Sequence, residues 1–279
     1  LHNAASIRFH APEGDRTKDP YRSNIGGTQN VLDVCKCAGI EEFHHVSTAY
    51  VSGARTDRCY EHELDVGQDY VNDYQISKVE AEKLTRGADF IKSLTVYRPG
   101  LVVGDSRTGF TTAPDFGLYH YIQFNTQIMK TLRSGGNTGT VQLPFRLRFT
   151  GNELRNIVTV DWIADSIVHL VTHPEHHGTT YNLTPDQPIT SRFIVESLSE
   201  YFDYEGVEFI GRHVEEHERT EMEKLFYDYV STFEAYWEEE PQFDRSNTDR
   251  VLGEVLPTPP IDGPCLERLI RFAVEECFS

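Results

Sequence analysis

Residues 24–46 read NIGGTQNVLDVCKCAGIEEFHHV, and this stretch sets the pattern on which the fold depends. Apolar side chains recur at helical spacing from Asn24 to Ala38, and Gly39 is a typical residue to end such a helix. Phe43 to Val46 then begins a short, buried β run. The stretch therefore predicts a helix, a turn and a strand.

The same alternation continues downstream. An amphipathic helix is expected from Val71 to Ile91, followed by a β run from Leu94 to Val103 that a Pro-Gly turn interrupts. Strands that alternate with helices predict an α/β fold with a doubly wound parallel sheet. Ligands of such sheets bind beyond the carboxyl ends of the strands, where Thr48 and the 98–100 turn are expected.

The clear alternation of strand and helix patterns in the sequence ends after Gly104. We expect residues 1–104 to form one domain and residues 105–279 a smaller, mostly helical substrate domain, with residues 155–185 returning to the sheet as a strand and a helix entered at Asp161. The aromatic and apolar residues from Leu118 to Leu132 recur at mixed intervals, so the sequence does not assign a secondary structure to that stretch. An amphipathic helix is expected from Cys265 to Phe278.

Tyr74 and Lys78 are the most suggestive pair of side chains. Positions i and i+4 of a helix share a face, so a phenol and an ammonium would point into the same space. A cation nearby lowers the pKa of a phenol, which makes Tyr74 a candidate general acid or base. Thr48, at the end of the preceding strand, is a candidate hydrogen-bond partner for the same reacting oxygen.

Composition and charge exclude several classes of partner. The formal net charge of −18 repels nucleic acids, and no basic cluster offsets it. No apolar run is long enough for a membrane span, and the amino terminus carries no secretion signal, so a cytoplasmic location is expected. Five cysteines without framework spacing indicate reduced thiols. The chain starts at Leu1, within what reads as a strand end, and we expect it to be a cropped chain.

Five motifs, in order, resemble the extended short-chain dehydrogenase/reductase superfamily. They are the alanine pair of His2-Asn3-Ala4-Ala5, the Asn-x-x-Gly-Thr helix at Asn24 to Thr28, the Ser/Thr strand end Val46-Ser47-Thr48, the Tyr-x-x-x-Lys pair Tyr74 and Lys78, and the turn Arg98-Pro99-Gly100. Val160-Asp161 resembles a later strand end of the same family. The order of the motifs is more specific than any one of them.

This resemblance implies nicotinamide-dependent chemistry and a Rossmann-like fold, in which residues 1–104 would be the carboxyl half of the dinucleotide-binding domain. Tyr74 would protonate the substrate oxygen, Thr48 would orient it with Ser47 as the alternate donor, and Lys78 would hold the cofactor ribose. The cofactor would be NADP or NAD, with NADP slightly favoured, and the partner a small-molecule substrate. The implied cofactor-binding residues are Asn3, Ala4, Ala5, Asn24, Ser47, Tyr74, Lys78, Arg98, Pro99, Gly100, Leu101 and Val102.

The superfamily's glycine-rich turn and first strands have no counterpart in these 279 residues. Because that turn holds the cofactor's pyrophosphate, the sequence leaves open whether this chain binds the cofactor. Ser47 to Gly53 and the run from Tyr97 to Gly109 look most similar to acyl-thioester reductases, including fatty acyl-CoA reductases. Nucleotide-sugar epimerases or dehydratases and hydroxysteroid-type dehydrogenases are the alternatives. A catalytically silent binding module is the alternative from another class.

Histidines give a weaker signal, and no metal site is expected. His213-x-x-Glu216-His217 fits an inverted zinc-peptidase pattern, but the segment is densely acidic and offers no third ligand. The histidines at 44–45, 173 and 176–177 are interpreted as ordinary surface or core residues. An aromatic stripe from Glu221 to Glu240 is expected to pack onto the substrate domain, or else to cap an apolar pocket or contact a second copy in a homodimer.

Overall fold

A computed structural model of the chain describes residues 1–134, 136 and 138–278. Gly135, Asn137 and Ser279, which belong to the predicted substrate domain, lie outside the described residues. The chain divides into two compact units, and each unit is assembled from three separate segments. The first unit comprises Leu1–Gly100, Trp162–Asp186 and Pro241–Thr258, and the second comprises Leu101–Asp161, Gln187–Glu240 and Pro259–Ser279.

The first unit is built on a parallel sheet. Its strands are β1 (Glu42–Val46), β2 (Ser93–Pro99) and β7 (Thr180–Leu183), in the order β1-β2-β7. His2 forms a parallel bridge to His45, so the start of the chain lies along the free edge of β1. The return of the chain to the sheet is made by β7, which lies beside β2.

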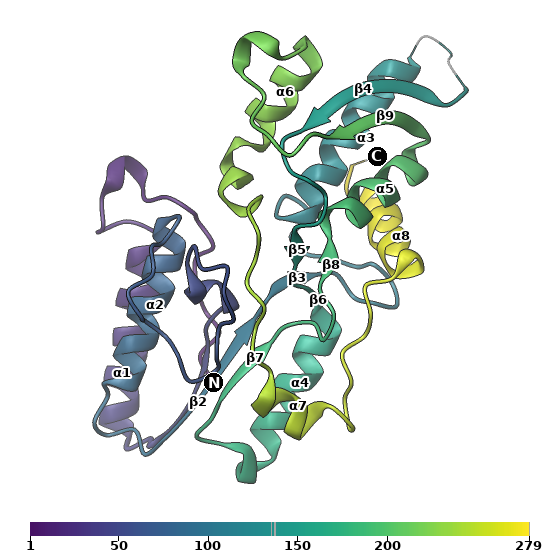
Figure 1. The fold of residues 1–279 in the computed structure, drawn as a ribbon. Helices are drawn as coiled ribbons and strands as arrows, with labels where there is room; N and C mark the ends of the chain where they lie inside the picture. The colour runs from purple at the N-terminus through teal and green to yellow at the C-terminus, as the bar shows by residue number, and fades with distance from the viewer. Residues whose placement is uncertain (135, 137, 279) are drawn as a thin grey trace. The chain divides into compact units, whose positions relative to one another are not determined.

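Helices cover both sides of this sheet (Figure 1). On one side are α1 (Gly27–Ala38), which continues a π-helical turn at Arg22–Gly26, and α2 (Asp73–Arg86). On the other side are α4 (Val160–Thr172) and α7 (Ser246–Leu252). Gly39 ends α1 with a left-handed φ of 68°, as the sequence predicts. Short 3-10 helices occur at Pro12–Gly14, Ala49–Ser52 and Pro174–His176.

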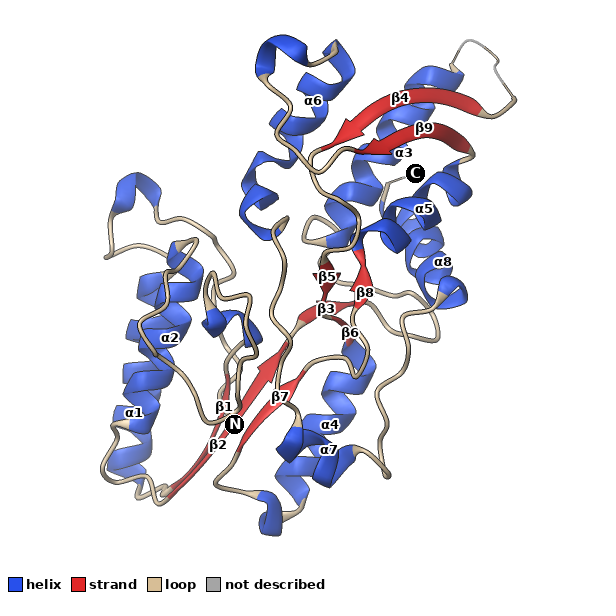
Figure 2. Cartoon of the chain, viewed as in Figure 1, coloured by secondary structure: helices blue, strands red, loops and turns tan. Residues whose placement is uncertain are grey.

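The second unit contains short strand pairs set among helices (Figure 2). β3 (Leu101–Val103) pairs with β6 (Ile157–Thr159), and β4 (Val141–Leu147) pairs with β9 (Tyr204–Phe209), both in parallel. β5 (Leu154–Arg155) and β8 (Ile189–Thr190) are antiparallel. The helices are α3 (Leu118–Arg133), α5 (Ser191–Phe202), α6 (Glu221–Val230) and α8 (Gly263–Phe272), with shorter turns at Glu216–Glu218, Ser231–Tyr236 and Ala273–Cys277.

Two apolar clusters form the core of the second unit, and α3 contributes to both. Leu118 and Ile122 pack in one cluster with α5 and α8, whereas Phe124 and Ile128 pack in the other with α6, β4 and β9. The aromatic stripe from Glu221 to Glu240 enters this second cluster through Phe226, Tyr227 and Trp237. The expected packing onto the substrate domain therefore describes most of the stripe.

The sheet of the first unit confirms the expected α/β class, with parallel strands and helices on both faces. The expected helix start at Asp161 is off by one residue, because α4 begins at Val160. The Asp161 carboxylate instead accepts hydrogen bonds from the Ser106 amide and hydroxyl, at 2.9 and 2.6 Å. None of the helices in the described part of the chain is long and apolar enough to cross a membrane.

Candidate active site

Thr48 lies directly after β1, at the carboxyl edge of the first unit's sheet. It caps the Ala49–Ser52 turn, and its hydroxyl oxygen accepts from the Tyr50 amide at 3.2 Å. Gly53 closes the turn with a φ of 64°, and a Cβ there would stand 2.2 Å from the Asp69 carbonyl oxygen, so only glycine fits. The Thr48 side chain is 4% exposed and is held in one place by this turn.

Tyr74 stands in the first turn of α2. Asn72 caps this helix by accepting from the Gln75 amide at 3.0 Å. The neighbouring Asp73 accepts from the Ala11 amide at 2.8 Å and from the Tyr21 hydroxyl at 2.7 Å, which ties the start of α2 to the segment after the first strand end. The Thr48 hydroxyl lies close enough to the Tyr74 phenol to lower its pKa. The structure thus brings Thr48 and Tyr74 into contact, although 26 residues separate them.

Lys78 follows one helical turn later and is 3% exposed. Its Nζ donates to the Val46 carbonyl oxygen at 2.8 Å, so it lies at the last residue of β1. Burial lowers the pKa of Lys78 to about 8, and the Glu82 carboxylate opposes that shift. An ammonium has three donors, and among the described contacts Lys78 uses one of them.

The pKa of Tyr74 moves in the direction opposite to the expected one. Burial raises it, and the nearby Thr48 hydroxyl only partly offsets that rise. The predicted lowering by Lys78 is wrong for this structure because the Lys78 ammonium is bound at Val46. Tyr74 therefore keeps its proton at neutral pH, a state suited to a proton donor.

Asn24 and Ser47 position the elements around the site. The Asn24 amide donates to the Ser77 hydroxyl at 2.9 Å and to the Ser6 carbonyl oxygen at 3.0 Å, and it accepts from the Ser6 amide at 2.7 Å. Both ends of its side chain are therefore engaged within the protein. The Ser47 hydroxyl lies against the Glu82 carboxylate and helps to lower its pKa, whereas Thr48 is directed to Tyr74.

Arg98 forms a buried ion pair with Glu82 in this structure. Its guanidinium donates to both Glu82 oxygens, at 3.1 and 2.6 Å, and both side chains are buried. Burial alone would raise the pKa of Glu82, but Arg98 outweighs it and holds that pKa at about 2. Any contact of the 98–100 turn with a cofactor would therefore come from its backbone. Glu82 itself was missed by the sequence analysis, although Tyr74, Lys78 and Glu82 share one helix face at four-residue steps.

The remaining predicted residues divide between exposed and buried positions. Asn3, Ala4 and Ala5 are exposed and follow the His2 bridge, beyond the end of the strand pairing with β1. Pro99 and Gly100 are buried at the end of β2, and the Gly100 amide donates to the Leu183 carbonyl oxygen at 3.1 Å. Leu101 and Val102 form β3 and belong to the second unit.

Comparison with known proteins identifies the family. The family model described as Male sterility protein, an NAD-binding family, matches residues 1–167. The chain belongs to this family, which is the thioester reductase-like part of the extended short-chain dehydrogenase/reductases.

Two curated relatives come from Aspergillus flavus. Nonribosomal peptide synthetase asaC is 26% identical over 199 residues, which cover 66% of this chain and 18% of that protein. Aldehyde reductase lnaA is 26% identical over 306 aligned residues, which cover 96% of this chain and 27% of that protein. The chain therefore spans less than a third of the length of either relative.

Solved structures share the fold. The terminal R domain of the myxalamid PKS-NRPS pathway matches with a TM-score of 0.75 at 21% identity, covering 100% of this chain and 68% of that one. UDP-glucuronic acid 4-epimerase from Bacillus cereus in complex with NAD matches with a TM-score of 0.64 at 18% identity, covering 98% and 71%. At these identities the likeness establishes a Rossmann-like fold.

Proposed function

We propose that this chain is the catalytic part of an NAD(P)-dependent reductase that acts on a carbonyl or an acyl thioester, with Tyr74 as general acid. The observation that carries the proposal is the approach of the Thr48 hydroxyl to the Tyr74 phenol, with Lys78 one turn further along α2 and bound at the end of β1. Thr48 and the Val46 carbonyl that binds Lys78 both lie at the carboxyl end of β1, and such folds bind their ligands at this edge of the sheet.

The chemistry assigns one role to each side chain. Adding hydride to a carbonyl carbon leaves a negative charge on its oxygen, which needs a proton. Tyr74 carries that proton at neutral pH because burial raises its pKa. The Thr48 hydroxyl, fixed by the Tyr50 amide, steadies the same oxygen.

A nicotinamide cofactor, when bound, would supply the hydride. Lys78 fits the ribose hydroxyls of such a group, because its buried ammonium has donors that the described contacts leave unused. The exposed backbone at Asn3, Ala4 and Ala5 would border the cofactor on the neighbouring strand end. We retain NADP as the slightly favoured form, with NAD as the alternative.

An acyl thioester is the substrate class that the relatives favour. Their names include a nonribosomal peptide synthetase and an aldehyde reductase, and the structural neighbours include a thiolation-reductase di-domain. An epimerase acting on a nucleotide sugar is the second candidate, because epimerase structures share the fold across 98% of the chain. Release of an aldehyde from a thioester, with net oxidation of the cofactor, distinguishes reductase from epimerase.

Tyr74→Phe tests the proposal in the complete gene product that contains this chain. With a pantetheine thioester and NADPH or NADH, we expect kcat/KM to fall by about 10² to 10⁴, because the proton donor is lost. The dissociation constant of the cofactor, measured by fluorescence titration, should change little. Loss of absorbance at 340 nm and aldehyde formation are the readouts.

Tyr70→Phe is the matched control. The Tyr70 hydroxyl is buried without a hydrogen-bond partner among the described residues, so the same change four positions away removes no hydrogen bond described in the structure. It should leave kcat/KM within about threefold of the parent, well short of the loss of a general acid. Turnover retained by Tyr74→Phe would reject the general-acid role. Absence of binding to either nucleotide by the complete protein would support the silent binding module instead.

A further inference from the structure

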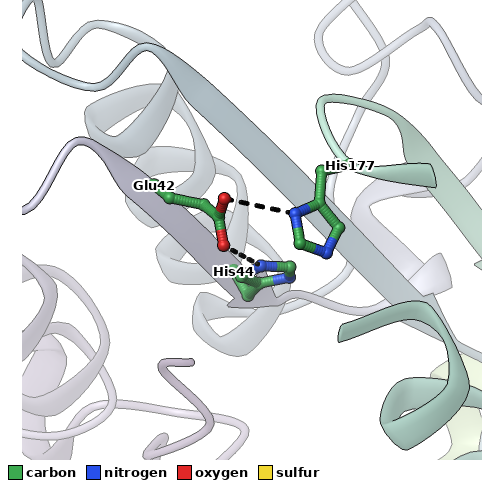
Figure 3. Close-up of side chains that lie close together, drawn as sticks. All are labelled: Glu42, His44 and His177. Atoms are coloured by element: carbon green, nitrogen blue, oxygen red, sulfur yellow. Dashed lines mark hydrogen bonds and ion pairs between the residues drawn. The ribbon is translucent and has the colours of Figure 1, made fainter. Parts of the chain in front are cut away.

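Three side chains meet at the other end of β1, away from the candidate active site. Glu42 is the first residue of β1 and His44 lies two positions along the same strand, so both point to one face of the sheet. His177 comes from the segment between the Pro174–His176 turn and β7. Figure 3 shows both imidazole rings turned toward the Glu42 carboxylate.

The spacing of these groups suits one small cation. The Glu42 Oε1 atom lies 3.3 Å from His44 Nε2, and Glu42 Oε2 lies 3.3 Å from His177 Nδ1. The three ligand atoms all stand within 4.8 Å of one another. A tetrahedral zinc ion with bonds of about 2.0–2.1 Å has ligand atoms roughly 3.3–3.4 Å apart.

His177 provides the independent observation. Its Nε2 lies 3.1 Å from the carbonyl oxygens of both Leu170 and Val171, and carbonyls only accept, so Nε2 carries the proton. Nδ1 is then the ring nitrogen that faces the Glu42 carboxylate, 3.3 Å from its Oε2 atom. The side chain is only 7% exposed, and Nδ1 has no hydrogen-bond partner among the described residues. A cation between Nδ1 and Glu42 could bond to both atoms in place of their direct contact.

His44 is also buried, and its second ring nitrogen also has a partner within the protein. It is 5% exposed, so its ring is enclosed within the fold. Its Nδ1 lies 2.7 Å from the hydroxyl of the fully buried Tyr97, which fixes the orientation of the ring. Metal-bound histidines commonly use their second nitrogen in this manner.

We propose that Glu42, His44 and His177 bind a divalent transition metal ion of the zinc class. Two imidazoles and one carboxylate favour zinc over magnesium or calcium, which prefer oxygen ligands. The half-exposed Glu42 leaves room for water as the fourth ligand. The ion would connect the start of β1 to the segment that leads into β7. This proposal departs from the expectation that the chain has no metal site.

Zinc binding to the metal-free protein tests this site. Competition against a chromophoric chelator should show one tight site per chain, and zinc should raise the melting temperature. Cobalt(II) added in place of zinc should give the visible absorption bands of a four-coordinate ion. Glu42→Gln, at an exposed position, should weaken zinc binding at least tenfold without lowering the melting temperature of the metal-free protein, and His177→Gln should weaken it further.

Two controls separate this site from other binding. Glu41→Gln makes the same change at the adjacent residue, whose carboxylate pairs with Lys92, and should leave zinc affinity unchanged. The double variant His169→Gln with His173→Gln removes two stacked histidines on α4 and its end. Zinc binding that survives Glu42→Gln, or that disappears in this double variant, would overturn the proposal. So would the absence of saturable binding, which is the behaviour expected of a simple Glu42–His177 ion pair.

Discussion

Lys78 places an ammonium group inside the first unit, where burial lowers its pKa to about 8 from an ordinary value of 10.5. Below pH 8 the folded and unfolded chains both carry the charge, and the folded chain bears the full cost of burying it. Between pH 8 and 10.5 the folded chain has lost this proton while the unfolded chain keeps it. The contribution of Lys78 to the free energy of unfolding therefore rises over that window.

Lys78→Met removes this pH dependence. We expect the stability difference, variant minus parent, to fall by roughly 1–3 kcal/mol as the pH rises from 8 to 10.5, because the parent recovers the cost of the charge. Urea unfolding at a series of pH values measures it. Lys83→Met, which removes a half-exposed ammonium from the same helix, corrects for the general effect of lost positive charge. A difference that stays constant between pH 8 and 10.5 would contradict the assigned shift.

Local sequence patterns were enough to propose the three residues of the candidate site, but not to predict their electrostatics. The spacing of Tyr74 and Lys78 and the strand end at Thr48 are local patterns that a sequence displays directly. The pKa directions depend on burial and on the Val46 carbonyl, which binds Lys78 only after β1 and α2 pack together. Their causes therefore lie in tertiary structure.

Between elements, the Glu82–Arg98 pair joins α2 to β2. Neither side chain is more than 3% exposed, and Arg86 contacts the same carboxylate. Such a pair contributes little net stability, yet breaking it leaves one charge buried without a partner. The pair thus holds the helix that carries Tyr74 against the strand that ends at the 98–100 turn.

Glu82→Gln is expected to lower the free energy of unfolding by about 3–5 kcal/mol, because Arg98 keeps its charge and loses its counter-ion. Chemical denaturation measures the change. Glu80→Gln is the matched control on the same helix, because Glu80 pairs with Arg16 at the surface and should cost less than about 1 kcal/mol. Equal losses of unfolding free energy in the two variants would show that burying the Glu82–Arg98 pair does not raise the cost of breaking it.

Elements with one polar face could be predicted, and elements buried on two faces could not. The helix expected at Val71–Ile91 is observed as the shorter α2, which starts after the Asn72 cap and ends at Arg86, five residues before the expected end. The stretch that contains α3 gave no clear pattern because the helix packs against two clusters and has apolar residues on more than one side. The pairing of β4 with β9 joins distant segments, so local sequence gives no signal of it.

At the scale of the whole molecule, the first unit is built from three separate segments of the chain. The Glu61 carboxylate forms hydrogen bonds that connect them. Glu61 belongs to the first segment and accepts from the Asn182 amide of the second at 3.1 Å. From the third segment it accepts from the Asn247 amide at 2.7 Å and the Thr248 hydroxyl at 3.1 Å. Burial raises the pKa of Glu61 despite these donors.

Glu61→Ala should destabilise the first unit as a whole, because it leaves donors from two segments buried without an acceptor. We expect a loss of about 2–4 kcal/mol in the free energy of unfolding, since each unsatisfied group costs about 1–3 kcal/mol. Hydrogen exchange should report weaker protection in β7 and α7 together. Asp69→Ala, an exposed carboxylate in the same loop, should have almost no effect. Loss of protection in α7 alone would contradict the joining role of Glu61.

The sequence indicated that the chain leaves the sheet and returns to it, but not the second return at Pro241–Thr258. That return depends in part on polar contacts such as those of Glu61 and on an isolated bridge between Cys59 and Phe243, and neither has a periodicity that a sequence could reveal. The same reason hid the cluster of Glu42, His44 and His177, whose third member lies more than a hundred positions from the other two.

The joining role of Glu61 has a consequence for biosynthesis. The chain leaves the ribosome from its amino end, and Thr248 emerges 148 residues after Gly100 (248 minus 100). At about 5–20 residues per second, this delay is roughly 7 to 30 seconds. During that time the Glu61 carboxylate lacks its partners Asn247 and Thr248, so the first unit can complete these hydrogen bonds only after most of the chain has been synthesised.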